Sequence, residues 1–189
     1  MEFRLMRPGE ERAVSELALR VYDRFVADQL SPQARREFQS YSDPLLLRFR
    51  SRWNHLVLLA VAEDAIAGMI EVRDDGHVAL FFVEGEHQGE GVGGELLRRS
   101  LSISRRRRPD LTKATVNSSP KAVAIYERLG FRKSGDEVAT GHFRLIPMVL
   151  YLGVLRGDRD PPLSPPSESG RALWGRESSL HPRRGPLRG

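Results

Sequence analysis

The glycine-rich stretch at residues 78–94 is the part of the chain whose residue types point most directly to chemistry. An apolar segment ends at Val83, and a turn with glycines at positions 89, 91, 93 and 94 leads into a segment rich in Leu and Arg. A helix that begins there presents backbone N–H groups without intrahelical partners and about half a positive charge. Glycine lets an anion approach these groups closely. The stretch therefore predicts a site for a phosphate-bearing cofactor.

Two other nucleotide-binding motifs must be weighed against this glycine turn. Gly89, Gly91 and Gly94 satisfy the G-x-G-x-x-G spacing of dinucleotide-binding proteins. That motif lies in the first turn of a parallel βαβ unit, whereas here it follows strands that we expect to be antiparallel, and Asn117 stands where a ribose-binding acid is expected. No Gly-Lys-Ser/Thr follows, which excludes a P-loop. On its own, the turn could still be purely structural.

A second group of residues follows at a distance and makes the interpretation more specific. Asn117 ends a short strand-like segment, and Tyr126 and Gly130-Phe131 lie in and after the helix-like segment that follows it. Together with Gln88, Gly91 and Gly93, these residues resemble the motifs of the GNAT family of acetyl-CoA-dependent N-acetyltransferases. The resemblance covers residues 2–152 and extends to a group of bacterial members of mostly unassigned substrate.

The resemblance implies an α/β (α+β) fold. We expect a GNAT-like mixed, mostly antiparallel central sheet of about seven strands flanked by about four helices. A V-shaped splay between strands 4 and 5 would hold the cofactor.

The resemblance also implies that acetyl-CoA is the cosubstrate. The backbone from Gln88 to Gly93 would hold the pyrophosphate, and the strand end would pair with the pantetheine arm, with an N–H near Val83 polarising the thioester carbonyl. Asn117 would bond the cofactor or a bound water, unless it only caps a turn. The expected cofactor-binding residues are Phe81, Phe82, Val83, Gln88, Gly89, Glu90, Gly91, Val92, Gly93, Asn117 and Tyr126.

Tyr126 resembles the family's general acid, which the resemblance implies would protonate the departing thiolate. A phenol has a pKa near 10 and is protonated at neutral pH, although a tyrosine on the apolar face of a helix can also be a simple core residue. Three candidates for the general base stay open: Glu71, Glu84 or a chain of waters. Each carboxylate could instead be solvated or paired.

The predicted function is acetyl transfer to a primary amine of an unidentified small molecule or protein, by direct attack in a ternary complex. The alternative is a non-catalytic acyl-CoA-binding sensor or regulatory module. The resemblance leaves open whether the protein is a monomer or a homodimer.

The elements that must position these residues follow from hydrophobic periodicity and turn residues. Ser31-Pro32 and Asp43-Pro44 are each a cap residue followed by a proline suited to a first helical turn. Gly130 suits a helix C-terminus. We expect strands at 2–7, 55–62, 65–73, 77–83, 112–117, 131–138 and 142–152, and helices at 10–27, 90–106 and 120–129. Two short helices are expected within residues 31–52, with starts at Ser31-Pro32 and Asp43-Pro44.

Composition narrows the possible partners. The chain has no cysteine, and its five histidines show no metal-ligand spacing, so we expect no metal. The net charge of +5 falls mostly beyond Gly153, where seven arginines face four acids, and this disfavours nucleic acid as a partner of the folded part. Apolar runs are far shorter than the roughly 20 residues of a membrane span, and no secretory signal is visible, so we expect a cytoplasmic protein without a membrane partner.

The chain divides into two parts by composition. Residues 1–152 form the predicted GNAT domain. Residues 153–189 hold half of the prolines and few apolar residues, which predicts a disordered C-terminal tail rich in Pro, Arg, Gly and Ser.

Overall fold

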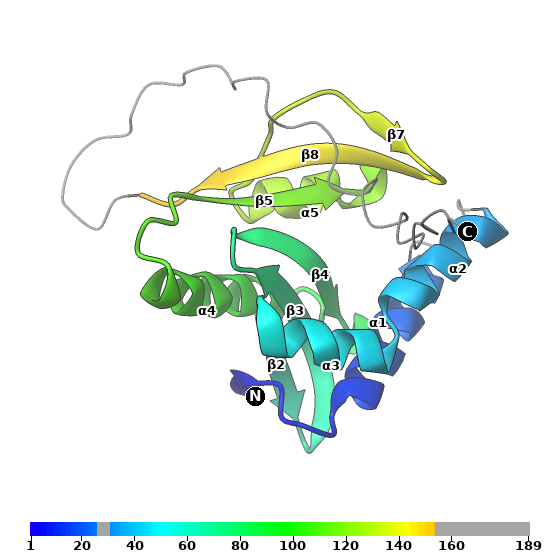
Figure 1. Cartoon of the computed structure of the whole chain (residues 1–189), viewed down its shortest axis with the longest axis vertical. Helices are drawn as coiled ribbons and strands as arrows, with labels where there is room; N and C mark the ends of the chain where they lie inside the picture. Colours follow the sequence, from blue (N-terminus) through cyan, green and yellow to red (C-terminus); the bar gives the residue numbers. More distant parts are fainter. Residues whose placement is uncertain (26–30, 154–189) are drawn as a thin grey trace, which may run out of the picture. The chain divides into compact units, whose positions relative to one another are not determined.

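The computed structural model describes residues 1–25 and 31–153 (Figure 1). All but the first residue of the predicted tail lies outside this range. The helices and strands, in chain order, are β1 (Glu2–Leu5), α1 (Glu11–Phe25), α2 (Pro32–Tyr41), α3 (Pro44–Trp53), β2 (His55–Ala62), β3 (Ala65–Arg73), β4 (His77–Val83), α4 (Val92–Arg107), β5 (Lys113–Ser118), α5 (Val123–Arg128), β6 (Arg132–Lys133), β7 (Val138–Thr140) and β8 (Phe143–Tyr151).

One mixed sheet organises these elements. Its strand order is β1-β2-β3-β4-β5-β8-β6, with β7 paired to β8 off this path. All neighbouring strands run antiparallel except β4 and β5, which are parallel. The predicted meander of β2, β3 and β4 is confirmed, and so is the expected fold class.

The parallel pair β4–β5 is very short. It comprises only His77 opposite Thr115 and Val78 opposite Val116, after which the two strands diverge, as Figure 1 shows. The predicted splay between strands 4 and 5 is therefore present. Gly76, in the turn before β4, accepts the Thr115 N–H at 3.1 Å. Its φ is +84°, and a Cβ there would lie 2.6 Å from the Lys113 carbonyl oxygen, so the closed end of the splay requires glycine.

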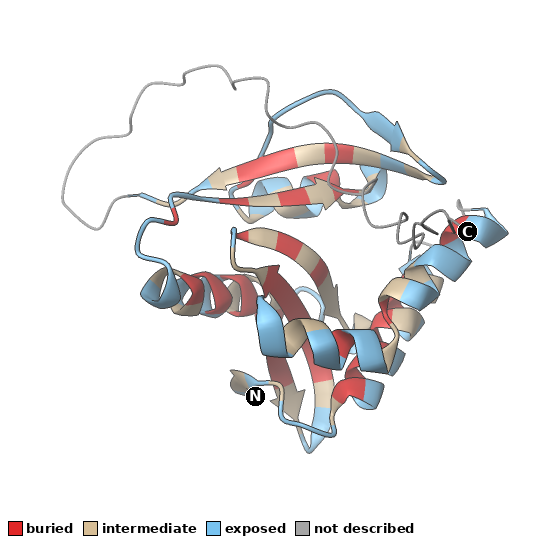
Figure 2. Ribbon diagram, viewed as in Figure 1, coloured by how far each residue is buried: buried red, intermediate tan, exposed pale blue. Residues whose placement is uncertain are grey.

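Helices cover both faces of the sheet and enclose two apolar clusters (Figure 2). On one face α4 packs on β2, β3 and β4; its cluster includes Leu58, Ile70, Leu96, Leu97, Val116 and Met148. On the other face α1 and α3 pack on the same strands; that cluster includes Val14, Leu17, Leu47, Val57, Met69 and Leu80. Alternating strand residues therefore face opposite layers, as the period of two requires.

The helix starts predicted from Ser-Pro and Asp-Pro are confirmed. The Ser31 hydroxyl accepts the Ala34 N–H at 3.2 Å, and Asp43 Oδ1 accepts the Leu45 and Leu46 N–H groups at 2.8 and 3.2 Å. These bonds satisfy donors that have no partner inside the helix. No helix of the described residues is long and apolar enough to cross a membrane.

The C-terminal part differs from the sequence-based prediction in its details. The strand expected at 131–138 is wrong in extent: within it only β6 (Arg132–Lys133) is extended, and β7 (Val138–Thr140) begins at its last residue. Both short strands pair with β8. The last helix begins at Val123, after a 3-10 turn at Pro120–Ala122. β5 continues through Asn117 to Ser118, because its antiparallel pairing with β8 extends that far.

Candidate functional site

The predicted glycine turn lies between β4 and α4. A 3-10 turn at Gly85–His87 follows β4, and Gly89 and Gly91 then adopt φ values of +84° and +83°. These left-handed conformations are open to glycine at little cost. Gly91 is the residue that caps α4, and no side chain caps this helix end. The backbone therefore enters α4 with its first N–H groups uncovered.

The turn exposes a row of hydrogen-bond donors. Among the described residues, none accepts a hydrogen bond from the backbone N–H groups of Gly89 to Gly94; the first group with a partner is that of Glu95, which donates to the Gly91 carbonyl at 3.0 Å. A Cβ at Gly89 or Gly91 would meet nothing within 4 Å. An open row of N–H groups at a helix N-terminus suits an anion such as a pyrophosphate.

Gln88 holds this turn against the end of β4. Its backbone N–H donates to the Gly85 carbonyl at 3.3 Å, inside the 3-10 turn. Its side-chain amide donates to the Val83 carbonyl at 2.9 Å. Both contacts fix the position of the donors that follow.

The end of β4 leaves backbone groups free toward the splay. The Glu84 N–H donates to Ala67 on β3 at 2.8 Å, so by strand alternation the N–H of Phe82 also points to β3. The N–H groups of Phe81 and Val83 then point to the side of β5, with which β4 no longer pairs at this level. An extended group bound there could add to the sheet as a further strand.

Tyr126 lies close to this strand end. Its ring centroid is 6.2 Å from that of Phe81 and 5.4 Å from that of Phe131, an edge-to-face contact. A Cβ at Gly93 would lie 3.4 Å from Phe81 Cζ, so the start of α4 also reaches this ring. Phe81, Gly93 and Tyr126, which are far apart in the sequence, therefore meet. Burial raises the pKa of Tyr126 above its usual value, so the phenol is protonated at neutral pH.

Asn117 lies on β5, one residue beyond the last pair with β4. This position is the beginning of the splay. Its partner on β8 is Pro147, which has no N–H to donate. Among the described residues no side-chain hydrogen bond of Asn117 is found, and its half-buried amide is free to bond a ligand or water.

The two candidate bases differ in their surroundings. Glu71 is fully buried on β3, where His55 Nδ1 lies 2.7 Å from its Oε1 and Arg50 donates to both oxygens at 2.7 and 3.1 Å. Burial alone would raise its pKa, but the hydrogen bonds from His55 and Arg50 hold the pKa below its usual value. Glu71 belongs to the layer beneath α3, on the face of the sheet opposite α4.

Glu84 directly follows β4 and is 21% exposed. Arg20 on α1 donates to its Oε1 through Nε and Nη2, at 3.1 and 2.7 Å. Glu84 Oε2 makes no hydrogen bond to another described residue. One carboxylate oxygen next to Val83 is therefore free to take a proton.

Several contacts that hold the site were not expected from the sequence. They are the Arg50–Glu71–His55 group, the Arg20–Glu84 pair and the Gln88 side-chain bond to Val83. The contacts of Glu71 and of Glu84 join residues that are far apart in the chain, so the spacing of residues in the sequence could not indicate them. Gln88 was selected only for its backbone.

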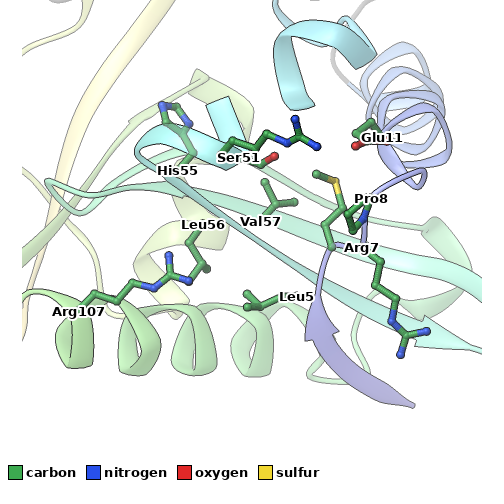
Figure 3. Close-up of a pocket in the computed structure, with 11 residues that line it drawn as sticks. Leu5, Arg7, Pro8, Glu11, Ser51, His55, Leu56, Val57 and Arg107 are labelled. Atoms are coloured by element: carbon green, nitrogen blue, oxygen red, sulfur yellow. The ribbon is translucent and has the colours of Figure 1, made fainter. Parts of the chain in front are cut away.

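A separate pocket lies away from the glycine turn. It is formed where β1 ends, beside the start of β2 and the ends of α3 and α4, and Figure 3 shows Arg7, Glu11, Ser51, His55 and Arg107 around it. No residue of the glycine turn or of the splay lines it. Within the described part of the chain, no three His, Cys, Asp or Glu side chains gather to hold a metal ion.

Comparison with known proteins gives a consistent result. Residues 26–152 match the family model of the acetyltransferase (GNAT) domain. Over 102 residues, 49% of this chain and 68% of the relative, the chain is 24% identical to N-alpha-acetyltransferase 30 of Schizosaccharomyces pombe.

Two solved structures share the fold. A GCN5-related N-acetyltransferase of Rhodopseudomonas palustris superposes with a TM-score of 0.69 at 17% identity, over 80% of this chain and 95% of that one. The PaiA N-acetyltransferase of Thermoplasma acidophilum, solved with coenzyme A, superposes with a TM-score of 0.65 at 16% identity, over 80% of this chain and 100% of that one.

Proposed function

Because the chain belongs to the GNAT acetyltransferase family, we propose that it transfers the acetyl group of acetyl-CoA to a primary amine of a small molecule or a protein. The single observation that supports this most strongly is the meeting of an uncovered glycine turn, a splayed strand end and Tyr126 at one place. Residues 1–152 form the catalytic domain in this proposal, and the remaining residues are an appended tail.

Acetyl-CoA would bind along the splay. The N–H groups from Gly89 to Gly93 would hold the pyrophosphate, with Gln88 fixing the turn through the Val83 carbonyl. The pantetheine arm would pair with the free backbone N–H group of Phe81, which leaves the N–H group of Val83 for the thioester carbonyl. Asn117 would bond the arm from the opposite strand. This binding mode uses donors whose directions the fold has already fixed, so little ordering is required on binding.

The reaction would proceed by direct attack in a ternary complex. The neutral amine attacks the thioester carbon and forms the C–N bond, which turns the carbonyl oxygen into the oxyanion of a tetrahedral intermediate. The C–S bond breaks as the carbonyl re-forms, and the nitrogen loses its extra proton to the base. The Val83 N–H points to the developing oxyanion and stabilises it. Tyr126 donates its phenolic proton to the departing thiolate, and its raised pKa keeps that proton in place at neutral pH.

Glu84 is the better of the two candidate bases. A base must reach the amine or a water bound to it, and Glu84 Oε2 lies free at the end of β4. Both oxygens of Glu71 are already bonded inside the protein, to Arg50 and His55, and its side chain is completely buried. We therefore assign proton removal to Glu84, directly or through water, and a structural role to Glu71.

Release of coenzyme A is the test of this function. The full chain is incubated with acetyl-CoA and a panel of primary amines, and the free thiol is followed with a thiol reagent. The panel includes peptides with free N-termini, because the Schizosaccharomyces pombe relative is named an N-alpha-acetyltransferase. Amine-dependent thiol release is expected for one class of amine. Tight acetyl-CoA binding without release for any amine would instead favour the non-catalytic acyl-CoA-binding module.

The Glu84→Gln variant tests the base within the same assay. It keeps the side chain's size and removes its basicity, so turnover should fall about 100-fold or more near neutral pH while acetyl-CoA binding is kept. Glu16→Gln, an exposed acid of α1, is the matched control. Equal rates for Glu84→Gln and Glu16→Gln would remove Glu84 from the mechanism.

A further inference from the structure

The helix α3 presents an unusual row of apolar side chains to the outside. Leu45, Phe49 and Trp53 are 73%, 59% and 76% exposed, and Leu46 beside them is 49% exposed. Their spacing of four residues places them on one side of the helix. The Phe49 and Trp53 rings contact each other, with centroids 5.8 Å apart. Figure 2 shows exposed stretches along this helix.

The opposite side of α3 is fixed to the sheet. Leu47 is buried in the cluster beneath the helix, and Arg50 donates to the buried carboxylate of Glu71. The Arg50 guanidinium also stacks over the Tyr41 ring, 4.1 Å from its centroid. These contacts hold the helix rigidly, so its apolar row cannot turn inward.

Arginines border the apolar row. Arg48 and Arg52 are exposed on α3, and the helix has no acidic residue. Arg48 lies 3.9 Å from Glu11, while Arg52 has no ion pair with any described residue. Arg7, Arg52 and Arg107 line the pocket beside the end of the helix, and Figure 3 shows Arg7 and Arg107 on two sides of it. The apolar row is therefore set in a basic surface.

We propose that α3 is a peripheral binding surface for an anionic lipid membrane. A helix with Leu, Phe and Trp on one side and arginines beside them binds in the interface of a bilayer, with its apolar side chains among the acyl chains and its cations at the headgroups. The helix is too short to span a bilayer, so the contact is peripheral.

Other occupants of this surface fit less well. A symmetric contact between two copies of α3 would bring Arg48 and Arg52 of each copy toward like charges. A single-stranded nucleic acid would suit the arginines and the two aromatic rings, but it would leave Leu45 and Leu46 exposed. A lipid surface accommodates both the apolar and the charged side chains.

Co-sedimentation with vesicles tests the proposal. The full chain is mixed with vesicles of phosphatidylcholine alone, or with vesicles that also contain about 30% of the anionic lipid phosphatidylserine. Binding is expected only to the anionic vesicles. Phe49→Ala/Trp53→Ala should lower the partition coefficient at least tenfold, and Arg48→Gln/Arg52→Gln about thirtyfold, since each arginine near such a surface contributes about one kcal/mol.

Matched controls separate this surface from exposed apolar side chains and cations elsewhere on the protein. Ile125→Ala/Val138→Ala removes two exposed apolar side chains elsewhere, and Arg128→Gln/Arg132→Gln removes two exposed cations elsewhere; both should bind like the unchanged protein. Equal binding of the Phe49→Ala/Trp53→Ala protein and the unchanged protein would overturn the proposal. Two other results would overturn it if the unchanged protein does not bind the vesicles. One is that the unchanged protein binds single-stranded RNA and the Phe49→Ala/Trp53→Ala protein does not. The other is that the unchanged protein is a dimer by light scattering and this variant is not.

Trp53 provides a direct signal of insertion. The chain has two tryptophans, Trp53 and Trp174, so Trp174→Phe leaves Trp53 as the only fluorophore of this kind. Its emission should shift to shorter wavelength with anionic vesicles and stay unchanged with phosphatidylcholine alone. An unchanged emission with anionic vesicles would contradict insertion of α3.

Discussion

Removing the Glu71 carboxylate should destabilise the protein strongly without acting on the chemistry. Glu71 is completely buried, and three hydrogen bonds from Arg50 and His55 satisfy its two oxygens. In Glu71→Ala the Arg50 guanidinium, whose side chain is 14% exposed, would remain largely buried without its counter-ion. Breaking one partner of a buried pair costs about 3–5 kcal/mol, a large share of the roughly 5–15 kcal/mol by which domains are stable.

Urea unfolding at neutral pH measures this loss. The free energy of unfolding of Glu71→Ala should fall by about 3–5 kcal/mol, and that of the exposed control Glu16→Ala by less than about 0.5 kcal/mol. The double variant Glu71→Met/Arg50→Met should recover much of the loss, because it leaves no unpaired charge in the interior.

The pH dependence gives a second readout of the same residue. The pKa of Glu71 is lowered in the folded protein, so its ionised form stabilises the fold above the ordinary carboxylate pKa, and this stabilisation is lost as the pH falls through the lowered pKa. The difference between the unchanged protein and Glu71→Gln should therefore shrink in acid. A Glu71→Ala protein that unfolds like the unchanged one, yet has lost turnover, would refute the structural role and identify Glu71 as a base.

Three further predictions concern the splay and the turn. Burial lowers the pKa of His77 from 6.5 to about 4, so as the pH falls the unfolded chain takes up this proton before the folded protein does. The free energy of unfolding should therefore fall by about 3 kcal/mol between pH 6.5 and pH 4. In unfolding curves measured across this range, His77→Gln should abolish that pH dependence. Gly76→Ala would force a Cβ to 2.6 Å from the Lys113 carbonyl oxygen at a φ of +84°, and its unfolding free energy should fall by about 2–4 kcal/mol. In Gly91→Ala the new Cβ has open space, but a φ of +83° is strained for alanine, so the backbone should shift and redirect the row of N–H groups. Calorimetry should then show roughly tenfold weaker binding of acetyl-CoA, or about 1.4 kcal/mol.

Local features of the sequence predicted much of the fold. The caps at Ser31 and Asp43 act within three residues of their position, and the turn at Gly89–Gly94 depends on glycine's own backbone freedom. The strands of the meander follow one another directly. Because each of these features depends on neighbours in the chain, the residue pattern was sufficient to find them.

Contacts between distant parts of the chain could not be predicted in this way. Glu71 was a candidate base in the sequence because nothing there shows that Arg50 and His55 reach it. The Arg20–Glu84 pair likewise joins residues 64 positions apart. In place of the expected strand at 131–138, two short strands, β6 and β7, pair with β8. Their positions depend on the register of β8, which comes later in the chain.

The exposed face of α3 is another such case. The expectation of no membrane partner was based on the absence of a long apolar run, which excludes only a spanning segment. The exposure of Phe49 and Trp53 depends on which side of the helix Leu47 and Arg50 fix to the sheet. That choice is made by tertiary packing, so the sequence pattern alone did not indicate that these apolar side chains are exposed.

The kinetics of Tyr126→Phe test the central claim most directly. The substitution removes one hydroxyl and keeps the ring that contacts Phe81 and Phe131. With an amine substrate from the panel, kcat should fall about 100-fold or more, while the Kd for acetyl-CoA measured by calorimetry stays within about twofold. A kcat equal to that of the unchanged protein would contradict the assignment of Tyr126 as the proton donor to the departing thiolate.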